Sequence, residues 1–416
     1  MDIFDRCYKF YNDNNYARSI GYPANPRMAK ALGLYPFFLE IEGNEGTEIT
    51  IDSNKYIMIG SNNYLGLTNH PKVKEAAIKA IKKYGSACTG SRFLNGTLDL
   101  HIELEEQLAA FVGKESALVF STGYQTNLGT ITSLLTKDSV VIADKEIHGS
   151  IIDAMYLAKS YRKIEVRFFK HNDVDSLEKV LMSYTLDKPK LVVVDGVFSM
   201  SGDIAPLPRI TSLCKKYNSR IMVDDAHSLG VLGNGKGTSA HFNCTSDVDI
   251  IMGTFSKSLA SIGGFISGTR DVVHWIQHLA RSLVFSASLP PSNAAAVIAA
   301  LEIIKNEPER VEKVNRISAY MRNELQSIGY DIGTSQTPVV PIIIGDQFKV
   351  MQAWELLFRN GIYTNVALPP AVAPSRALLR TSYMATHTEE QIERVLNQFY
   401  KVKEILQVKS KVGKHL

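Results

Sequence analysis

The sequence has few cysteines and no long apolar run, and both absences exclude classes of protein. The four cysteines, Cys7, Cys88, Cys214 and Cys244, lie far apart, without a Cys-x-x-Cys pair or a spacing typical of metal ligands. This usage argues against a disulfide framework and structural zinc and favours a reducing compartment, the cytoplasm. No apolar run reaches the length of a membrane span, and the first residues show neither region of a signal peptide.

The chain also lacks a strong excess of charge of one sign. Its formal net charge is +4 over 416 residues, which gives no basic footprint for nucleic acid. Hydrophobic residues make up 45% and charged residues 21%, as in a folded globular protein rather than a disordered or fibrous one. One basic cluster, in the C-terminal tail, is compatible with a peripheral contact to anionic lipid, although such lysines are usually solvated; it comprises Lys401, Lys403, Lys409, Lys411 and Lys414.

The length fits one large domain and a smaller one. Strand-like and helix-like segments alternate through the middle of the chain, which predicts an α/β domain with a mostly parallel seven-stranded sheet covered by helices. We expect its strands at 117–120, 140–143, 165–169, 191–194, 220–223, 250–252 and 265–267. The composition changes near 288–292, so we divide the chain into an N-terminal arm at 1–60, a large domain at 61–292 and a small α+β C-terminal domain at 293–416.

Further elements follow from apolar periodicity and from helix-end signals. Residues 46–52 and 56–59 read as an edge hairpin, and residues 339–344 and 378–381 read as strands of the small domain. Helices are expected at 71–84, 101–112 and 293–305. The last helix should follow Thr388, which has Gln391 at capping-box spacing, and should bury Ile392, Val395, Leu396, Phe399 and Val402.

One lysine, Lys257, lies among small and hydroxyl residues between two short apolar segments, 249–252 and 264–268. Such a lysine should sit on a tight connection between two strands. A lysine without a nearby acid is either a solvated loop residue or a lysine that forms a Schiff base. For a lone lysine the first interpretation is the more common. The residues at the other strand ends are therefore needed to choose between the two interpretations.

An acid follows the apolar strand 220–223, and a histidine follows three residues later: Asp224 and His227. A carboxylate at the end of a buried strand is costly unless it meets a cation. A protonated pyridine nitrogen is such a cation. A lysine that holds an aldehyde and an acid that holds a ring nitrogen are the electron-sink arrangement of pyridoxal phosphate enzymes.

Three more strand ends carry candidate site residues. Gly123 opens a helix after strand 117–120, which indicates either a phosphate cradle or a plain turn. His148 follows strand 140–143, where it could stack on a flat ring or be incidental, and Ser199 follows strand 191–194. Because ligands bind at the carboxyl ends of strands in open α/β sheets, the ordered set favours one site.

The same segments resemble the α-oxoamine synthase family of fold-type-I pyridoxal phosphate enzymes, and within it the group of bacterial serine palmitoyltransferases. The resemblance spans nearly the whole chain and keeps the order of the motifs. The matching segments are 61–66, 90–97, 120–124, 196–200, 223–227, 253–257 and 285–288.

The resemblance implies a role for each candidate residue toward pyridoxal 5'-phosphate. Lys257 would form the Schiff base and move the proton on the substrate Cα, Asp224 would pair with the ring nitrogen, and His148 would stack on the ring. His227 and Ser199 would reach the ring oxygen.

It also implies phosphate and substrate contacts. The residues expected at the phosphate are Gly123, Tyr124, Thr254 and Ser256, with Ser286 supplied by the partner subunit of a homodimer with shared active sites. Arg380 matches the arginine that takes the amino-acid carboxylate, and Asn62, Asn63 and Tyr64 would line the substrate side. An arginine suits this role better than a lysine because its planar fork binds a carboxylate through two hydrogen bonds.

The implied reaction is a decarboxylating condensation of L-serine with a long-chain acyl-CoA, palmitoyl-CoA, giving 3-ketodihydrosphingosine. Two alternatives stay open. A sister enzyme would use glycine or alanine with another acyl-CoA, as in 2-amino-3-ketobutyrate CoA ligase or 8-amino-7-oxononanoate synthase, and an inactive subunit would keep only the fold. Residues 363–374 resemble the mobile proline loop of serine palmitoyltransferases, but Leu368 replaces an arginine that some members carry before the two prolines, so that arginine's role must be absent or met by Arg380.

Overall fold

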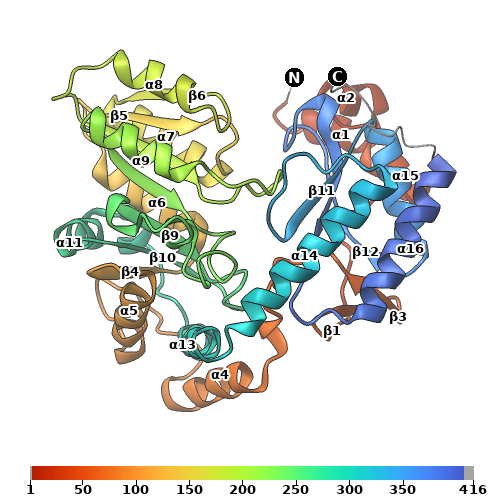
Figure 1. The fold of residues 1–416 in the computed structure, drawn as a ribbon, viewed down its shortest axis with the longest axis horizontal. Helices are drawn as coiled ribbons and strands as arrows, with labels where there is room; N and C mark the ends of the chain where they lie inside the picture. The colour runs from red at the N-terminus through yellow and green to blue at the C-terminus, as the bar shows by residue number, and fades with distance from the viewer. Residues whose placement is uncertain (1, 407–416) are drawn as a thin grey trace. The chain divides into compact units, whose positions relative to one another are not determined.

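The computed structural model describes residues 2–406, which divide into two compact units (Figure 1). The larger unit contains Asn63–Ser199 and Asp203–Lys313. The smaller unit contains the residues up to Asn62, Met200–Gly202 and the residues from Val314 onward. Each unit has a hydrophobic core of its own.

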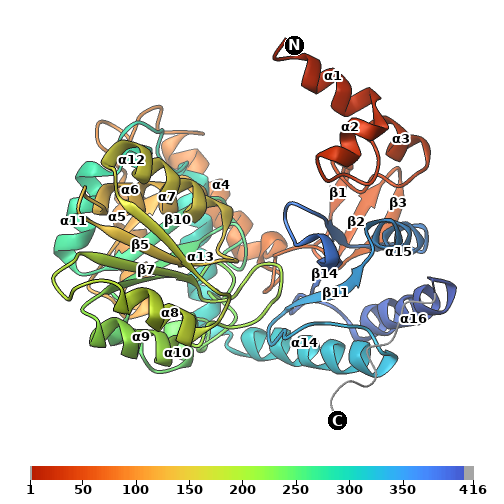
Figure 2. The same cartoon turned by 90° about the horizontal axis from the view of Figure 1, so that it is seen from above.

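A seven-stranded sheet forms the centre of the larger unit, with helices on both sides of it (Figure 2). The strand order is β4-β10-β9-β8-β7-β5-β6. Neighbours from β9 to β6 are parallel, whereas β10 is antiparallel to both β9 and β4. The predicted α/β fold with a mostly parallel sheet is therefore confirmed. All seven predicted strands are present: β4 Ser116–Phe120, β5 Val140–Asp144, β6 Glu165–Phe169, β7 Lys190–Asp195, β8 Arg220–Asp224, β9 Ile250–Thr254 and β10 Gly264–Gly268.

Helices cover both faces of this sheet because alternate apolar residues of each strand point to opposite sides. One face buries Val141, Val193, Met222 and Met252 beneath four helices, α6 Gly123–Leu134, α7 Gly149–Arg162, α11 Arg270–Leu279 and α12 Arg281–Val284. The other face packs against α5 Asp99–Val112, α8 Val174–Met182 and α9 Leu207–Lys216. Helix α13, Pro291–Asn306, packs against α4, Pro71–Tyr84, and α5, while α10, Thr238–His241, is a single turn.

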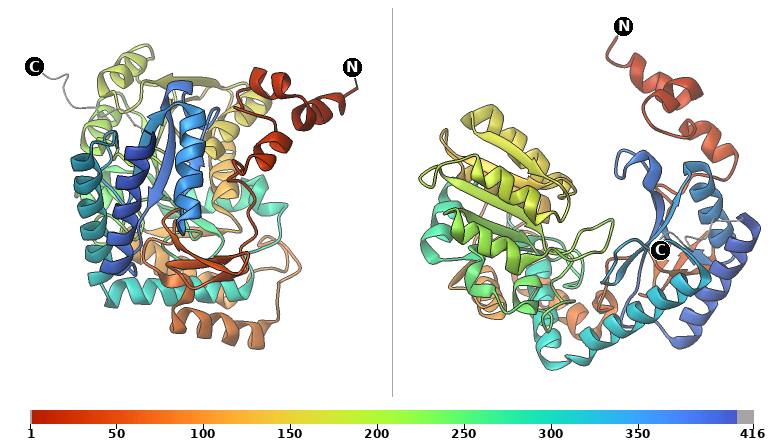
Figure 3. Two further views of the ribbon diagram at one scale, coloured as in Figure 1. Left: turned by 90° about the vertical axis from the view of Figure 1, so that its right-hand side faces the viewer. Right: turned by 45° about the horizontal axis from the view of Figure 1, so that its top comes forward.

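The smaller unit holds two sheets, one in the order β1-β2-β3-β12 and one in the order β11-β14-β13. Their strands are β1 Gly43–Asn44, β2 Glu48–Ile51, β3 Asn54–Met58, β11 Val339–Gly345, β12 Ile362–Tyr363, β13 Asn365–Ala367 and β14 Ala377–Ser382. The helices are α1 Asp5–Asn12, α2 Asn14–Ser19, α3 Pro26–Ala31, α15 Gln347–Arg359 and α16 Glu389–Leu406. Helix α14, Glu309–Ile328, belongs to this unit from Val314 onward. The predicted hairpin is β2–β3, and α15 packs against β11 and β14 (Figure 3).

The predicted capping box of the last helix is present. The backbone N–H of Gln391 donates to Thr388 Oγ1 and that of Thr388 donates to Gln391 Oε1, both at 3.2 Å. All five apolar residues expected on the inner face of this helix are buried. No helix among residues 2–406 has the length and hydropathy needed to cross a membrane.

Candidate active site

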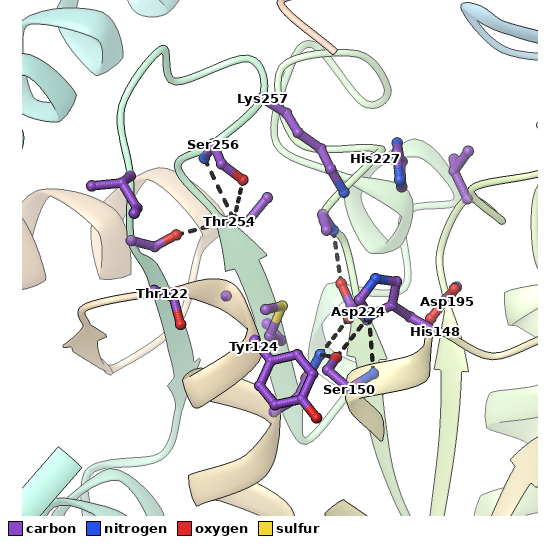
Figure 4. A pocket seen from close by; sticks show the side chains of 17 residues that line it. Thr122, Tyr124, His148, Ser150, Asp195, Asp224, His227, Thr254, Ser256 and Lys257 are labelled. Atoms are coloured by element: carbon purple, nitrogen blue, oxygen red, sulfur yellow. Dashed lines mark hydrogen bonds between the residues drawn. The ribbon is translucent and has the colours of Figure 1, made fainter. Parts of the chain in front are cut away.

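A cavity of about 300 Å³ lies within the larger unit, at the carboxyl ends of β7, β8 and β9 (Figure 4). It brings together eight of the residues singled out in the sequence: Gly123, Tyr124, His148, Asp224, His227, Thr254, Ser256 and Lys257. Its other lining residues are Thr122, Asn127, Ser150, Asp195, Val197, Ala226, Met252, Ile262 and Gly263.

Lys257 stands on the connection between β9 and β10, as its flanking apolar segments predict. This connection is a tight loop: the N–H of Phe255 donates to the carbonyl of Gly263 at 2.9 Å, and the N–H of Ser261 donates to the carbonyl of Phe255 at 2.9 Å. Ala260 adopts φ 55°, a left-handed conformation that costs a residue with a Cβ about 1 kcal/mol or more. The surrounding bonds hold this strained turn, so the backbone of Lys257 is fixed.

Asp224 ends β8 and is 4% exposed. Each of its carboxyl oxygens accepts a hydrogen bond, one from the Asn127 amide at 2.7 Å and one from the N–H of Ala226 at 3.0 Å. Donors on both oxygens stabilise the charged carboxylate. The side chain thus presents a fixed anion to the pocket, as pairing with a ring nitrogen requires.

Two histidines stand at the pocket. The Nδ1 atom of His148 lies 2.7 Å from Ser150 Oγ, which orients the ring at the start of α7. Burial by the surrounding protein lowers the pKa of His148, while the charge of Asp224 acts in the opposite direction. Nδ1 of His227 lies 2.7 Å from the hydroxyl of the fully buried Tyr64, so this predicted substrate-side residue orients His227.

The start of α6 and the end of β9 form a cradle suited to a phosphate. The first N–H groups of a helix have no acceptor within the helix and attract anions. A Cβ on Gly123 would lie 2.8 Å from Thr254 Oγ1, so only glycine leaves this approach open. Thr254 Oγ1 is 3.0 Å from Ser256 Oγ, which places two hydroxyls at the same point. The residues present therefore fit pyridoxal phosphate, with a phosphate cradle, an anion for the ring nitrogen and a lysine for the aldehyde.

Six predicted residues are not among those that line this cavity: Asn62, Asn63, Tyr64, Ser199, Ser286 and Arg380. Ser199 stands two residues after Val197, which lines the cavity. Ser286 Oγ accepts a hydrogen bond from Gln125 Nε2 at 2.8 Å near the start of α6. Asn62 and Arg380 belong to the smaller unit, where Arg380 Nη2 donates to Asn62 Oδ1 at 3.0 Å. Asn63 donates to Thr68 Oγ1 at 2.8 Å within the larger unit, and Tyr64 contacts His227 there.

Sequence reasoning missed Asn127, Ser150 and Asp195. Asn127 lies one helical turn beyond Gly123, so it faces the same side of α6, and a search at that spacing could have found it. Its Nδ2 atom donates a hydrogen bond to Ser150 Oγ at 2.9 Å and another to Asp224 Oδ2. Asp195 is the last residue of β7, a position that the predicted strand stopped one residue short of.

A buried ion network supports the loop that carries Ser199. The Nδ1 atom of His171 lies 3.0 Å from Asp144 Oδ1, and its Nε2 atom lies 2.9 Å from Asp203 Oδ2. The ring also packs edge-on against Phe198, with 4.4 Å between the ring centroids. Burial lowers the pKa of His171, but hydrogen bonds to the two carboxylates outweigh it and raise the pKa to about 10.

Replacing His171 with glutamine should destabilise the protein by about 2–4 kcal/mol near pH 6, because two buried carboxylates lose their cation. The folded pKa is raised, so this stabilisation is fully present below the unfolded pKa of about 6.5 and is lost as the pH rises toward about 10. Urea unfolding of both proteins at pH 6 and pH 9.5 should show the difference shrinking. An equal difference at both pH values would contradict a charged His171.

Comparison with known proteins places the chain among pyridoxal phosphate enzymes. The model of the aminotransferase class I and II family matches residues 54–399. A serine palmitoyltransferase of Bacteroides ovatus is 48% identical over 90% of this chain and 95% of its own length. An 8-amino-7-oxononanoate synthase of Bacillus velezensis is 41% identical over 86% of this chain and 90% of its own.

Solved structures give the same result. A lysine-to-alanine variant of the serine palmitoyltransferase of S. paucimobilis, with a bound PLP–myriocin aldimine, superposes with a TM-score of 0.91. It is 34% identical and covers 98% of this chain and 100% of its own. Since that chain and this one share one fold over their full lengths, the predicted fold-type-I architecture is confirmed.

Proposed function

Because this chain belongs to the aminotransferase class I and II family, we propose that it condenses L-serine with palmitoyl-CoA to give 3-ketodihydrosphingosine, CoA and carbon dioxide. It is an α-oxoamine synthase, as the motifs predict, and its cofactor is pyridoxal 5'-phosphate. The observation that carries the proposal is the 48% identity to a serine palmitoyltransferase over 90% of the chain, together with Lys257 and Asp224 in one cavity.

The residues of the cavity divide the work. When bound, pyridoxal phosphate supplies an aldehyde that captures the amine and a ring that accepts the electron pair released at the substrate Cα. Asp224 keeps the ring nitrogen protonated, since its oxygens are fixed by Asn127 and Ala226. Lys257 takes the Cα proton, and returns one after the new carbon–carbon bond has formed and carbon dioxide has left. His148 covers the ring face.

The choice of substrates can be tested with the purified enzyme. L-Serine, glycine and L-alanine are titrated against the absorbance of the bound cofactor, and CoA release is then measured with C2, C7-dicarboxyl and C16 thioesters. We expect release with L-serine and the C16 thioester. Release only with alanine and the C7-dicarboxyl thioester would favour an 8-amino-7-oxononanoate synthase, and a colourless protein would favour an inactive subunit.

We also propose that Arg380 binds the carboxylate of the amino acid. Arg380 lies in β14, is 5% exposed, and donates to Asn62, so its planar fork is fixed. Arg380→Lys should raise the KM for L-serine about 10- to 100-fold, because an ammonium group cannot replace a two-point contact. Steady-state kinetics measure this, with the exposed Arg376→Lys as matched control. An unchanged KM in Arg380→Lys would assign the carboxylate to another residue.

We propose a homodimer in which Ser286 serves the partner's phosphate site. Support comes from an apolar groove of about 680 Å³ on the larger unit, lined partly by Leu157, Tyr161, Leu279 and Phe285. Tyr161 is 78% exposed and Phe285, next to Ser286, is 73% exposed. Burying these two aromatic side chains against a second subunit would be favourable because it removes apolar surface from water. Tyr161→Arg combined with Phe285→Arg should convert the dimer to a monomer in sedimentation velocity. A dimer that survives both changes would place the interface elsewhere.

We place the enzyme in the cytoplasm, and the four free cysteines of the described chain suit that compartment. A peripheral contact with lipid through the tail remains a proposal. Lys401 is exposed, but the ammonium group of Lys403 donates a hydrogen bond to the carbonyl of Ile328. Lys409, Lys411 and Lys414 lie outside the described residues.

A further inference from the structure

Two acids end neighbouring strands at the cavity. Asp195 on β7 and Asp224 on β8 are direct partners in the parallel register. Strand alternation sends both side chains to the face that α6 and α7 cover. Both residues are buried, at 3% and 4% exposure, and both line the cavity (Figure 4). Two carboxyl groups this close do not both ionise without a large cost.

The hydrogen bonds separate the two acids. Both oxygens of Asp224 accept from donors, which favours its charged form. Asp195 is bonded by the backbone N–H of His148, and its Oδ1 atom has no partner within residues 2–406. An oxygen that receives no donor is the one suited to carry a proton and to offer an O–H group to the pocket.

We propose that the carboxyl group of Asp195 stays neutral, so that Asp224 is the only carboxylate among the residues lining the cavity that faces the ring nitrogen of the cofactor. The identity of the cofactor comes from the proposed function; the neutrality of Asp195 does not depend on it. A second anion here would bind the ring proton more tightly and repel the carbanion formed at the substrate.

The groups that face Asp195 support a neutral carboxyl. They are Asp224 on β8, Lys257 after β9, and Asp144 and His148 at the end of β5. Burial raises the pKa of Asp195 well above its usual range, and the charges of Asp224 and Asp144 act in the same direction. Lys257 and the His148 N–H act against them.

The first test uses the full-length chain freed of cofactor. Because folded Asp195 keeps a proton that the unfolded chain releases above about pH 4, wild type loses stability relative to Asp195→Asn as the pH rises toward the folded pKa. In urea unfolding between pH 5 and pH 8, the ratio of the two unfolding constants should change by up to about tenfold per pH unit in favour of the variant. A ratio independent of pH overturns the proposal.

Two variants guard this test. Asp195→Ser, which is smaller and also neutral, replaces Asp195→Asn if the amide does not fold, and it should show the same pH slope. Asp138→Asn, at an exposed turn before β5, reports the same chemical change outside the cavity. If Asp138→Asn changed the ratio of unfolding constants with pH as steeply as Asp195→Asn, the effect could not be assigned to the cavity.

The second test adds pyridoxal phosphate and follows the absorbance of its Schiff base. Asp195→Asn should bind the cofactor within about threefold of wild type and keep the pH midpoint of this absorbance. Binding weakened more than about tenfold, or a moved midpoint, would mean that Asp195 acts as an anion and would overturn the proposal. Wild type that forms no absorbance band would instead contradict the proposed function, because the unfolding test stands without cofactor.

Discussion

Lys257→Ala is expected to lower the rate of condensation by at least about 10³- to 10⁴-fold, because the variant loses both the amine that holds the aldehyde and the base that moves the Cα proton. The cavity holds no second lysine among its lining residues, so no neighbouring amine can take over the capture of the aldehyde. CoA release with L-serine and palmitoyl-CoA measures the rate, and the absorbance of the Schiff base should disappear with it.

The fold should survive this change, since Lys257 stands on a loop held by backbone hydrogen bonds of Phe255, Ser261 and Gly263. Thermal unfolding of the cofactor-free variant therefore serves as the check on folding. Lys137→Ala, at an exposed turn, is the matched control and should keep full activity. Activity in Lys257→Ala within tenfold of wild type would show that another residue carries the chemistry.

Asp224→Ala is expected to lower kcat/KM by about 10³-fold and to weaken cofactor binding by about 30-fold or more. The ring nitrogen loses its anion, and a buried charged partner is worth about 2–5 kcal/mol. The variant also removes one of the two acceptors of the buried Asn127 amide, which keeps only Ser150 Oγ, and it removes the acceptor of the Ala226 N–H. Steady-state kinetics and titration of the cofactor-free protein with pyridoxal phosphate give the two quantities.

Asp224→Asn separates charge from structure. The new amide keeps one acceptor oxygen, and Asn127 has an unpartnered Oδ1 atom that can accept from its NH₂ group after a rotation of the Asn127 amide. This variant should unfold near the wild-type temperature and still lose most of the activity. If Asp224→Asn retains wild-type activity, the charge at this position is not what the ring requires.

The site could largely be predicted from the sequence because its chemistry lies at strand ends. Parallel strands bring their carboxyl ends to one edge, so Asp224, His148 and Lys257, which are far apart in the chain, converge once the strands are recognised. Strands β5 and β9 could be recognised in the sequence because they are buried along their whole length and consist mostly of apolar residues. Thr388 and Gln391 likewise marked a helix start by local hydrogen bonding, which needs no tertiary contact.

Other parts depend on contacts that local patterns do not record. Helix α1 buries none of its residues, and the sequence predicted only an N-terminal arm at 1–60 in this part of the chain. Asp195 faces the cavity because side chains alternate along β7. It lies beside Asp224 because of the register between β7 and β8, which the sequence does not show. The spacing from Gly123 places Asn127 on the pocket side of α6, but its hydrogen bond to Asp224 depends on the packing of α6 against the end of β8, which the sequence does not show.

The antiparallel placement of β10 between β9 and β4 has a mechanical consequence for catalysis. The connection of residues 255–263 joins two strands that pair with each other, and backbone hydrogen bonds among Phe255, Ser261 and Gly263 hold it in place. The backbone of Lys257 is therefore held in place, and only its side chain is left to move. Proton delivery must come from rotation about the four-carbon stem of the side chain, so its rate should follow crowding around the stem rather than motion of a lid.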